Sequence, residues 1–156
     1  MSRTRAVTKQ ELRSLTRRLD EPTRLAVMIS ADTGLRISDI LNLEAERLAR
    51  EMTVTEQKTG KTRKVSLSAE TYKFAQRIAK HSGKYLINID RSTVYRHIKA
   101  AAADMGLTHV SMHSIRKYYA RRYCRAHGLA QTQREMAHDY LSTTLLYVVD
   151  PDELEE

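Results

Sequence analysis

Residues 52–68 read MTVTEQKTGKTRKVSLS, and this stretch decides the fold class. Apolar and polar residues alternate on both sides of KTGK, which is the pattern of two strands with one buried face. Gly60 supplies the residue that a tight turn needs, so we predict a β-hairpin. The hairpin is expected to project four basic side chains: Lys58, Lys61, Arg63 and Lys64.

Helical patterns lie on both sides of this hairpin. Thr8 and Glu11 form a capping box for a first helix that runs to about Asp20. A second helix begins near Pro22 and ends at Gly34, and its apolar run LAVMI is expected to be buried. Further helices are predicted over residues 35–43, 68–83, 91–106, 111–128, 132–138 and 142–149, whereas 85–89 could be a strand or a plain connection. The prediction is one mainly helical domain with a small β-hairpin (α+β).

Composition points to a polyanionic partner. The 156 residues suffice for one domain, and 27 Lys and Arg against 19 Asp and Glu give a net charge of +8. The acids gather in residues 150–156, so the body of the chain is more basic than that total. Such a balance favours nucleic acid first and an anionic membrane surface second.

Targeting signals and disulfides are not expected. Cys124 is the single cysteine, which excludes an intramolecular disulfide. No apolar run approaches the roughly 20 residues of a membrane span, and the first ten residues lack the apolar core of a signal peptide. These features predict a cytoplasmic protein.

Several side chains could carry chemistry, and each also has a plainer explanation. His113 and Arg116 lie three apart on one helix and could contact one anionic group, or could be a surface pair. Arg36 follows a helix break and could turn inward, or pair with Asp39 at the surface. Lys58 lies in a turn, where lysine is common because turns are exposed.

A basic stripe runs along the same predicted helix as His113. Lys117, Arg121 and Arg125 recur at intervals of four, so their charges align. The stripe is either a solvated face or, as the basic composition of the chain also allows, a contact for phosphate groups.

Taken together, these residue types suit phosphoryl transfer to a tyrosine without a metal. A phenol has a pKa near 10, so a base must take its proton at neutral pH. Guanidinium groups can bind non-bridging oxygens, and an ammonium can protonate a leaving sugar oxygen. The histidines are scattered, and neither H-E-x-x-H, C-x-x-C nor a glycine-rich phosphate loop occurs, so no metal and no cofactor are predicted.

Four motifs then match one family in its order. TGLRISDIL, QKTGK, HSIRKYYA and MAHDYLSTTLLY together resemble the catalytic domain of tyrosine recombinases, the phage integrase family. The resemblance covers about residues 7–149 and leaves 150–156 as a short acidic tail. It implies a single catalytic domain over 1–156, without the N-terminal core-DNA-binding domain that most members carry.

The resemblance implies roles for the residues on the first half of the site. Arg36 and Arg116 would hold the scissile phosphate, with Asp39 supporting the architecture around Arg36. Lys58 would act as the general acid toward the 5′-hydroxyl.

The remaining roles fall near the C-terminus. His113 would assist proton transfer at the tyrosine, and His138 would donate to a phosphate oxygen. Tyr147 would attack phosphorus and form a 3′-phosphotyrosyl link. The chain departs from the family where Ala137 replaces the usual glycine before His138, a change that removes no reactive group.

The implied partner is double-stranded DNA, with four protomers on two sites and no membrane. Besides the hairpin residues Lys61, Arg63 and Lys64, the stripe of Lys117, Arg121 and Arg125 would bind DNA. Two alternatives to a recombinase are a relaxing activity like that of type IB topoisomerases and a DNA-binding module without turnover.

Overall fold

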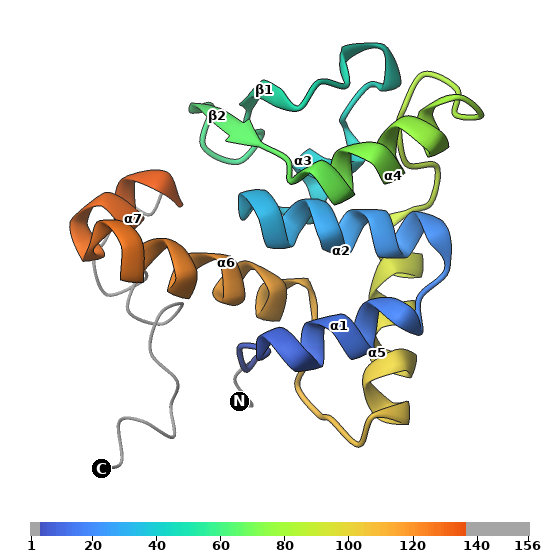
Figure 1. Ribbon diagram of the computed structural model, residues 1–156, viewed down its shortest axis with the longest axis vertical. Coiled ribbons are helices and arrows are strands. Elements are labelled where there is room, and N and C mark those ends of the chain that lie inside the picture. The colour runs from blue at the N-terminus through green and yellow to red at the C-terminus, as the bar shows by residue number, and fades with distance from the viewer. Residues whose placement is uncertain (1–3, 137–156) are drawn as a thin grey trace.

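The computed structural model describes residues 4–136, and the predicted helix over 142–149 lies outside them. The chain is mainly helical with one small antiparallel sheet, as predicted (Figure 1). The elements are α1 (Lys9–Arg17), α2 (Glu21–Thr33), α3 (Ile37–Leu41), a 3-10 turn (Ala45–Arg47), β1 (Glu51–Thr55), β2 (Thr62–Ser66), α4 (Ala69–Ala79), α5 (Arg91–Asp104), α6 (Met112–His127) and α7 (Leu129–Glu135).

Strands β1 and β2 form the predicted hairpin. They pair antiparallel with Met52 opposite Val65 and Val54 opposite Arg63, and Gly60 adopts a φ of 70° in the turn. Because side chains alternate along a strand, Arg63 lies on the same face as Val65. Arg63 is accordingly 6% exposed, so the prediction that it projects to solvent is wrong. Lys58, Lys61 and Lys64 are exposed as expected.

The predicted capping box at the first helix is confirmed. The Thr8 hydroxyl accepts from the Glu11 amide at 3.1 Å, and the Glu11 carboxylate accepts from the Thr8 amide at 3.0 Å. Helix α1 ends at Arg17, earlier than predicted, because Asp20 is used to cap the next helix. The Asp20 carboxylate accepts from the Thr23 amide at 3.2 Å.

Helix α4 ends at Ala79 and does not reach Gly83. The chain tightens at this point: the amides of His81 and Ser82 bond three residues back, to Ile78 and Ala79. The Ser82 hydroxyl also donates to the Ile78 carbonyl, which removes a helical acceptor. A hydroxyl that bonds the backbone therefore stops the helix before the glycine.

Helix α2 is the centre of the fold, with the hairpin and α4 on one side and α1 and α5 on the other (Figure 1). One apolar cluster includes Val27 and Ile115, and a second includes Ile29 and Val65. Apolar residues occur on several sides of α2 because neighbours cover it from both directions.

The connection over residues 85–89 forms no regular strand. It carries an isolated bridge between Tyr85 and Glu44, so of the two alternatives left open by the sequence, the connection is correct. Within the part of the chain that the structure describes, none of the helices combines the length and apolar character that crossing a bilayer would require.

Gly34 ends α2 and allows α6 to approach closely. Its φ is 72°, a conformation that glycine adopts without strain. A Cβ added to Gly34 would lie 2.3 Å from Cδ1 of Tyr119 on α6. The sharp break after α2 and its close contact with α6 therefore depend on the same residue.

Candidate active site

Arg36 lies directly after this break, as the residue that precedes the first turn of α3. Its guanidinium forms an ion pair with the carboxylate of Glu56, from Nη1 to Oε2. The side chain is 17% exposed, so Arg36 turns toward the hairpin and does not pair with Asp39 at the surface.

Asp39 connects α3 to the hairpin by a different contact. The residue is 3% exposed, and its Oδ1 accepts from the backbone amide of Gln57 at 3.0 Å. The carboxylate therefore holds the chain just before Lys58, next to the residue that pairs with Arg36.

Glu56 is a buried carboxylate that sequence reasoning did not single out. Its side chain has no exposed surface and lies between two guanidinium groups, those of Arg36 and Arg63, with Arg63 at 3.7 Å. A signal was present in the sequence: Glu56 follows Met52 and Val54 at intervals of two, so it occupies an inward position of the strand pattern. A charged residue in a buried register needs a partner of opposite charge.

Arg63 connects Glu56 to the ends of α2 and α7. Its Nη2 donates to the Thr33 carbonyl at 2.6 Å and to the Glu135 carboxylate at 2.7 Å. The same Glu135 oxygen accepts from the Tyr119 hydroxyl at 3.0 Å. Burial raises the pKa of Tyr119, and the neighbouring charge of Glu135 raises it further, so the phenol stays protonated and donates. Arg63 thus joins β2 to α2 and α7 instead of reaching outward.

Arg116 is placed by the first turns of α6. The helix begins after Ser111, whose hydroxyl accepts from the His113 amide at 3.2 Å. Arg116 is 2% exposed, and its Nε donates to the Gly34 carbonyl at 2.7 Å. Because Gly34 is two residues from Arg36, this bond brings the predicted arginines from α3 and α6 together.

His113 lies beside these arginines. Partial burial lowers the pKa of His113 below its ordinary value of 6.5, and the charges of Arg116, Lys117, Arg91 and Arg36 lower it further. The imidazole is therefore mostly neutral near pH 7 and able to accept a proton. Arg91, the first residue of α5, is another cation near the site that sequence reasoning missed; only its place at a helix start marked it.

Lys58 lies in the hairpin turn, which is connected to Arg36 through Glu56 and to Asp39 through the Gln57 amide. It is exposed and is separated from Glu56 by one residue. The turn is closed by two backbone bonds of 2.8 Å, from the Glu56 amide to the Lys61 carbonyl and from the Gly60 amide to the Glu56 carbonyl.

The predicted basic stripe on α6 faces the N-terminal segment. Lys117 donates from Nζ to the Thr4 carbonyl, which ties that segment to the helix. Arg121 and Arg125 line a cavity of about 490 Å³ together with residues 5–9. Arg121 and Arg125 therefore lie beside the N-terminal segment, whereas Lys117 is also near enough to His113 for its charge to lower the pKa of that imidazole.

Two predicted site residues, His138 and Tyr147, lie outside the described residues. The described chain ends just beyond α7, whose last residue is Glu135. Met136 follows and is fully buried. Residues 4–135 therefore provide the arginines, the lysine and one histidine of the predicted set.

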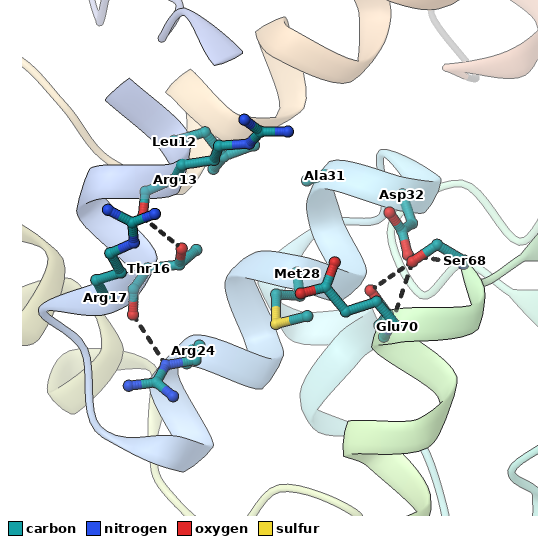
Figure 2. Close-up of a pocket in the computed structure, with 11 residues that line it drawn as sticks. Leu12, Arg13, Thr16, Arg17, Arg24, Met28, Ala31, Asp32, Ser68 and Glu70 are labelled. Atoms are coloured by element: carbon teal, nitrogen blue, oxygen red, sulfur yellow. Dashed lines mark hydrogen bonds between the residues drawn. The ribbon is translucent and has the colours of Figure 1, made fainter. Parts of the chain in front are cut away.

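A second cavity lies away from this group, between α1, α2 and α4 (Figure 2). Arg24 donates to the Thr16 and Leu19 carbonyls at 2.9 Å and so closes the end of α1. Asp32 accepts from the Ser68 amide at 2.9 Å, at the start of α4. The hydrogen bonds of Arg24 and Asp32 therefore stabilise the junctions between these helices. Across residues 4–136, His, Cys, Asp and Glu side chains form no group of three that could hold a metal ion.

Sequence comparisons identify the family. The model of the phage integrase family matches residues 5–153. The chain is also 32% identical over 136 residues to "Probable integrase/recombinase YoeC" of Bacillus subtilis (strain 168), covering 78% of this chain and 74% of that protein.

Solved structures share the fold. The XerA recombinase matches with a TM-score of 0.79 at 22% identity, over 99% of this chain and 64% of that one. A lambda integrase dimer bound to a COC′ core site matches with 0.77 at 18% identity, over 96% of this chain and 49% of that one. The catalytic domain of bacteriophage HP1 integrase matches with 0.69 at 20% identity, over 97% of this chain and 91% of that one.

The chain thus spans about half to two thirds of the length of the first two structures. The family model and the relative from Bacillus subtilis, which is named a probable integrase/recombinase, favour that class over a relaxing enzyme or a module without turnover. The chain belongs to the phage integrase family, and its fold is that of a tyrosine recombinase catalytic domain.

Proposed function

We propose that this domain cleaves and rejoins DNA strands through a phosphotyrosyl intermediate at Tyr147. The observation that carries the proposal is the grouping of Arg36, which precedes α3, with His113 and Arg116 of α6, beside the hairpin that carries Lys58. The Tyr147 oxygen forms a bond to phosphorus while the bond to the 5′-oxygen breaks. The 3′-phosphotyrosyl ester conserves the energy of the broken phosphodiester bond. A 5′-hydroxyl can therefore attack the phosphorus and reverse the step.

The arginines supply electrostatic stabilisation. Arg36 is oriented by Glu56, and Arg116 is oriented by the Gly34 carbonyl. A guanidinium that is held in this way presents a rigid fork for the non-bridging oxygens of a phosphate. Charge that develops on those oxygens is stabilised by groups that need no reorganisation.

Proton transfer is assigned to two residues, and a third donates a hydrogen bond. Neutral His113 accepts a proton from the attacking phenol, while Lys58 donates one to the leaving 5′-oxygen. His138 donates to a phosphate oxygen. Metal and high-energy cofactors have no step in this scheme.

DNA contact extends beyond the cleavage site. Lys61 and Lys64 on the hairpin, with Arg121 and Arg125 on α6, are proposed to contact backbone phosphates. Lys117 is left out of this set because it holds the Thr4 carbonyl, and Arg63 because it is buried. The lambda integrase above is a dimer on DNA; for this chain we propose four protomers on two DNA sites, acting in the cytoplasm.

A nicked suicide substrate tests the proposal. Cleavage next to the nick releases a short strand, so the covalent adduct accumulates and is seen on a denaturing gel. We expect the wild-type protein to form the adduct and Tyr147→Phe to form none. Tyr140→Phe is the matched control and should keep the adduct. If the wild type forms no adduct on its own target DNA, the proposal is wrong.

The pH dependence of cleavage should follow His113. Since the pKa of His113 is below 6.5, its neutral form persists as the pH falls to that value, and the acid limb of the rate should lie lower still. Arg91→Gln removes a nearby cation, so protonation becomes easier, the pKa of His113 rises and the acid limb moves to higher pH. Single-turnover cleavage against pH and an NMR titration of His113 measure both effects.

Arg96→Gln provides the control for this shift. Arg96 lies on the same helix as Arg91 and donates to the Thr93 hydroxyl. Its removal should leave the profile in place. An acid limb that does not respond to Arg91→Gln would rule out His113 as the group that titrates.

A further inference from the structure

We propose that Glu56 is a positioning residue that holds Lys58 at a fixed position relative to Arg36. The inference rests on the proposed function, in which Arg36 binds the phosphate and Lys58 protonates the leaving oxygen. Glu56 touches neither the substrate nor the reacting atoms. It acts through the arginine with which it pairs and through the turn that it closes.

The side chain of Glu56 is held from two directions. Its carboxylate has no exposed surface and pairs with Arg36, just before α3, and with Arg63 on β2. A buried carboxylate that leaves its partners loses both solvation and pairing, so this arrangement strongly favours one position. The first strand of the hairpin is thereby tied to the break after α2.

Arg63 is itself anchored, which makes the arrangement rigid. Its Nη2 donates to Thr33 at the end of α2 and to Glu135 at the end of α7. Glu56 therefore connects Arg36 to a partner that is fixed to two other elements. Movement of the hairpin base would separate several charges at once.

The backbone of Glu56 closes the turn that carries Lys58. The Glu56 amide donates to Lys61 and the Glu56 carbonyl accepts from Gly60, both at 2.8 Å. The next amide, that of Gln57, donates to Asp39 on α3 at 3.0 Å. With two peptide units between them, the Cα atoms of Glu56 and Lys58 are at most about 7.6 Å apart. The position of Glu56 therefore limits the position of Lys58.

This coupling matters because an isolated two-stranded hairpin is only marginally stable. Without further contacts, the turn of such a hairpin would move, and its lysine would sample a wide range of positions. Misplacing a catalytic group by about 1 Å can lower a rate by about 100-fold. The ion pairs of Glu56 restrict this range, because they connect the turn that carries Lys58 to the phosphate-binding Arg36.

The test compares two DNA substrates for Glu56→Gln. In the first, the leaving group is the normal 5′-oxygen. In the second, sulfur replaces that bridging oxygen, so the P–S bond breaks and a thiolate leaves. A thiol with a pKa of about 8.5 needs no general acid to depart, whereas an alcohol does. A defect in Lys58 placement should therefore appear mainly on the oxygen substrate.

We expect Glu56→Gln to slow single-turnover adduct formation by about 10- to 100-fold on the oxygen substrate. On the sulfur substrate the defect should shrink by about tenfold or more. Lys58→Ala serves as the reference for complete loss of the acid and should show the same recovery. An equal defect of Glu56→Gln on both substrates, or no defect on either, overturns the inference.

Controls separate placement from folding and from the proposed function. Glu44→Gln is the matched control, because Glu44 pairs with the exposed Arg47 and Lys84, and it should behave as wild type. Glu56→Asp keeps the buried charge but is one methylene shorter, so it tests placement even if Glu56→Gln does not fold. It should show the same recovery on sulfur. Wild-type protein that forms no adduct on either substrate would overturn the proposed function and this inference with it.

Discussion

Arg116→Lys is expected to lower the rate of adduct formation by about 100- to 1,000-fold, which is the usual cost of losing one preorganised donor to a transition state. Lysine has a single ammonium in place of the planar fork, and it cannot reproduce both the Nε bond to the Gly34 carbonyl and a contact with phosphate. Arg116 as a whole residue is 2% exposed, so few other positions are open to its side chain. Single-turnover cleavage of the suicide substrate at saturating protein measures the loss.

Arg47→Lys is the control for this substitution. Arg47 has an 84% exposed side chain and pairs only with its neighbour Glu44 among the described contacts. We expect its cleavage rate to stay within about twofold of wild type, as for most surface changes. DNA affinity should change little in Arg116→Lys, because the positive charge is kept. Full activity of Arg116→Lys would show that this arginine does not hold the scissile phosphate.

Gly34→Ala is expected to lower the free energy of unfolding by about 2–5 kcal/mol. A left-handed conformation costs a residue with a Cβ about 1–2 kcal/mol, and forcing an extra methyl into a packed contact costs a further 1–3 kcal/mol or so. Both costs apply because φ is 72° and the added Cβ would lie 2.3 Å from the Tyr119 ring. For a chain of 156 residues, this corresponds to a fall in Tm of roughly 5–15 °C.

Gly106→Ala separates the two costs. Gly106 has the same φ of 72°, but nothing lies within 4 Å of the position of its Cβ. It should therefore lose only the conformational part, about 1–2 kcal/mol. Thermal and denaturant unfolding of both variants give the difference, which measures the contact with Tyr119. Equal losses would mean that α6 moves away from Gly34 without cost.

Local patterns were enough to predict most of the elements. The hairpin over 52–68 was recognisable because alternation has a period of two and Gly60 permits the turn. The capping box at Thr8 was also readable, since both partners lie within four residues. The end of α4 was not, because a hydroxyl at Ser82 competes for a carbonyl that the helical pattern assigns to the backbone.

The candidate site was only partly predictable. The motifs singled out Arg36, His113 and Arg116, and the structure groups them. They did not reveal Glu56, although an acid at an inward strand position was a signal. Arg63 was misread because a basic residue beside a turn usually faces solvent, and its partners lie on other elements.

The sequence by itself determined the residue types, the hairpin, the helix caps and the family to which the chain belongs. These depend on neighbours a few residues apart and on the order of motifs. Only the tertiary structure decided that Arg36 pairs with Glu56, that Arg116 meets the Gly34 carbonyl and that Arg63 is buried. Those contacts join residues 20 to 82 positions apart, and no local propensity selects among the oppositely charged or polar partners available at such separations. Packing around α2 selects them, because a buried charge is stable only where a group of opposite charge or a hydrogen-bond partner lies within reach.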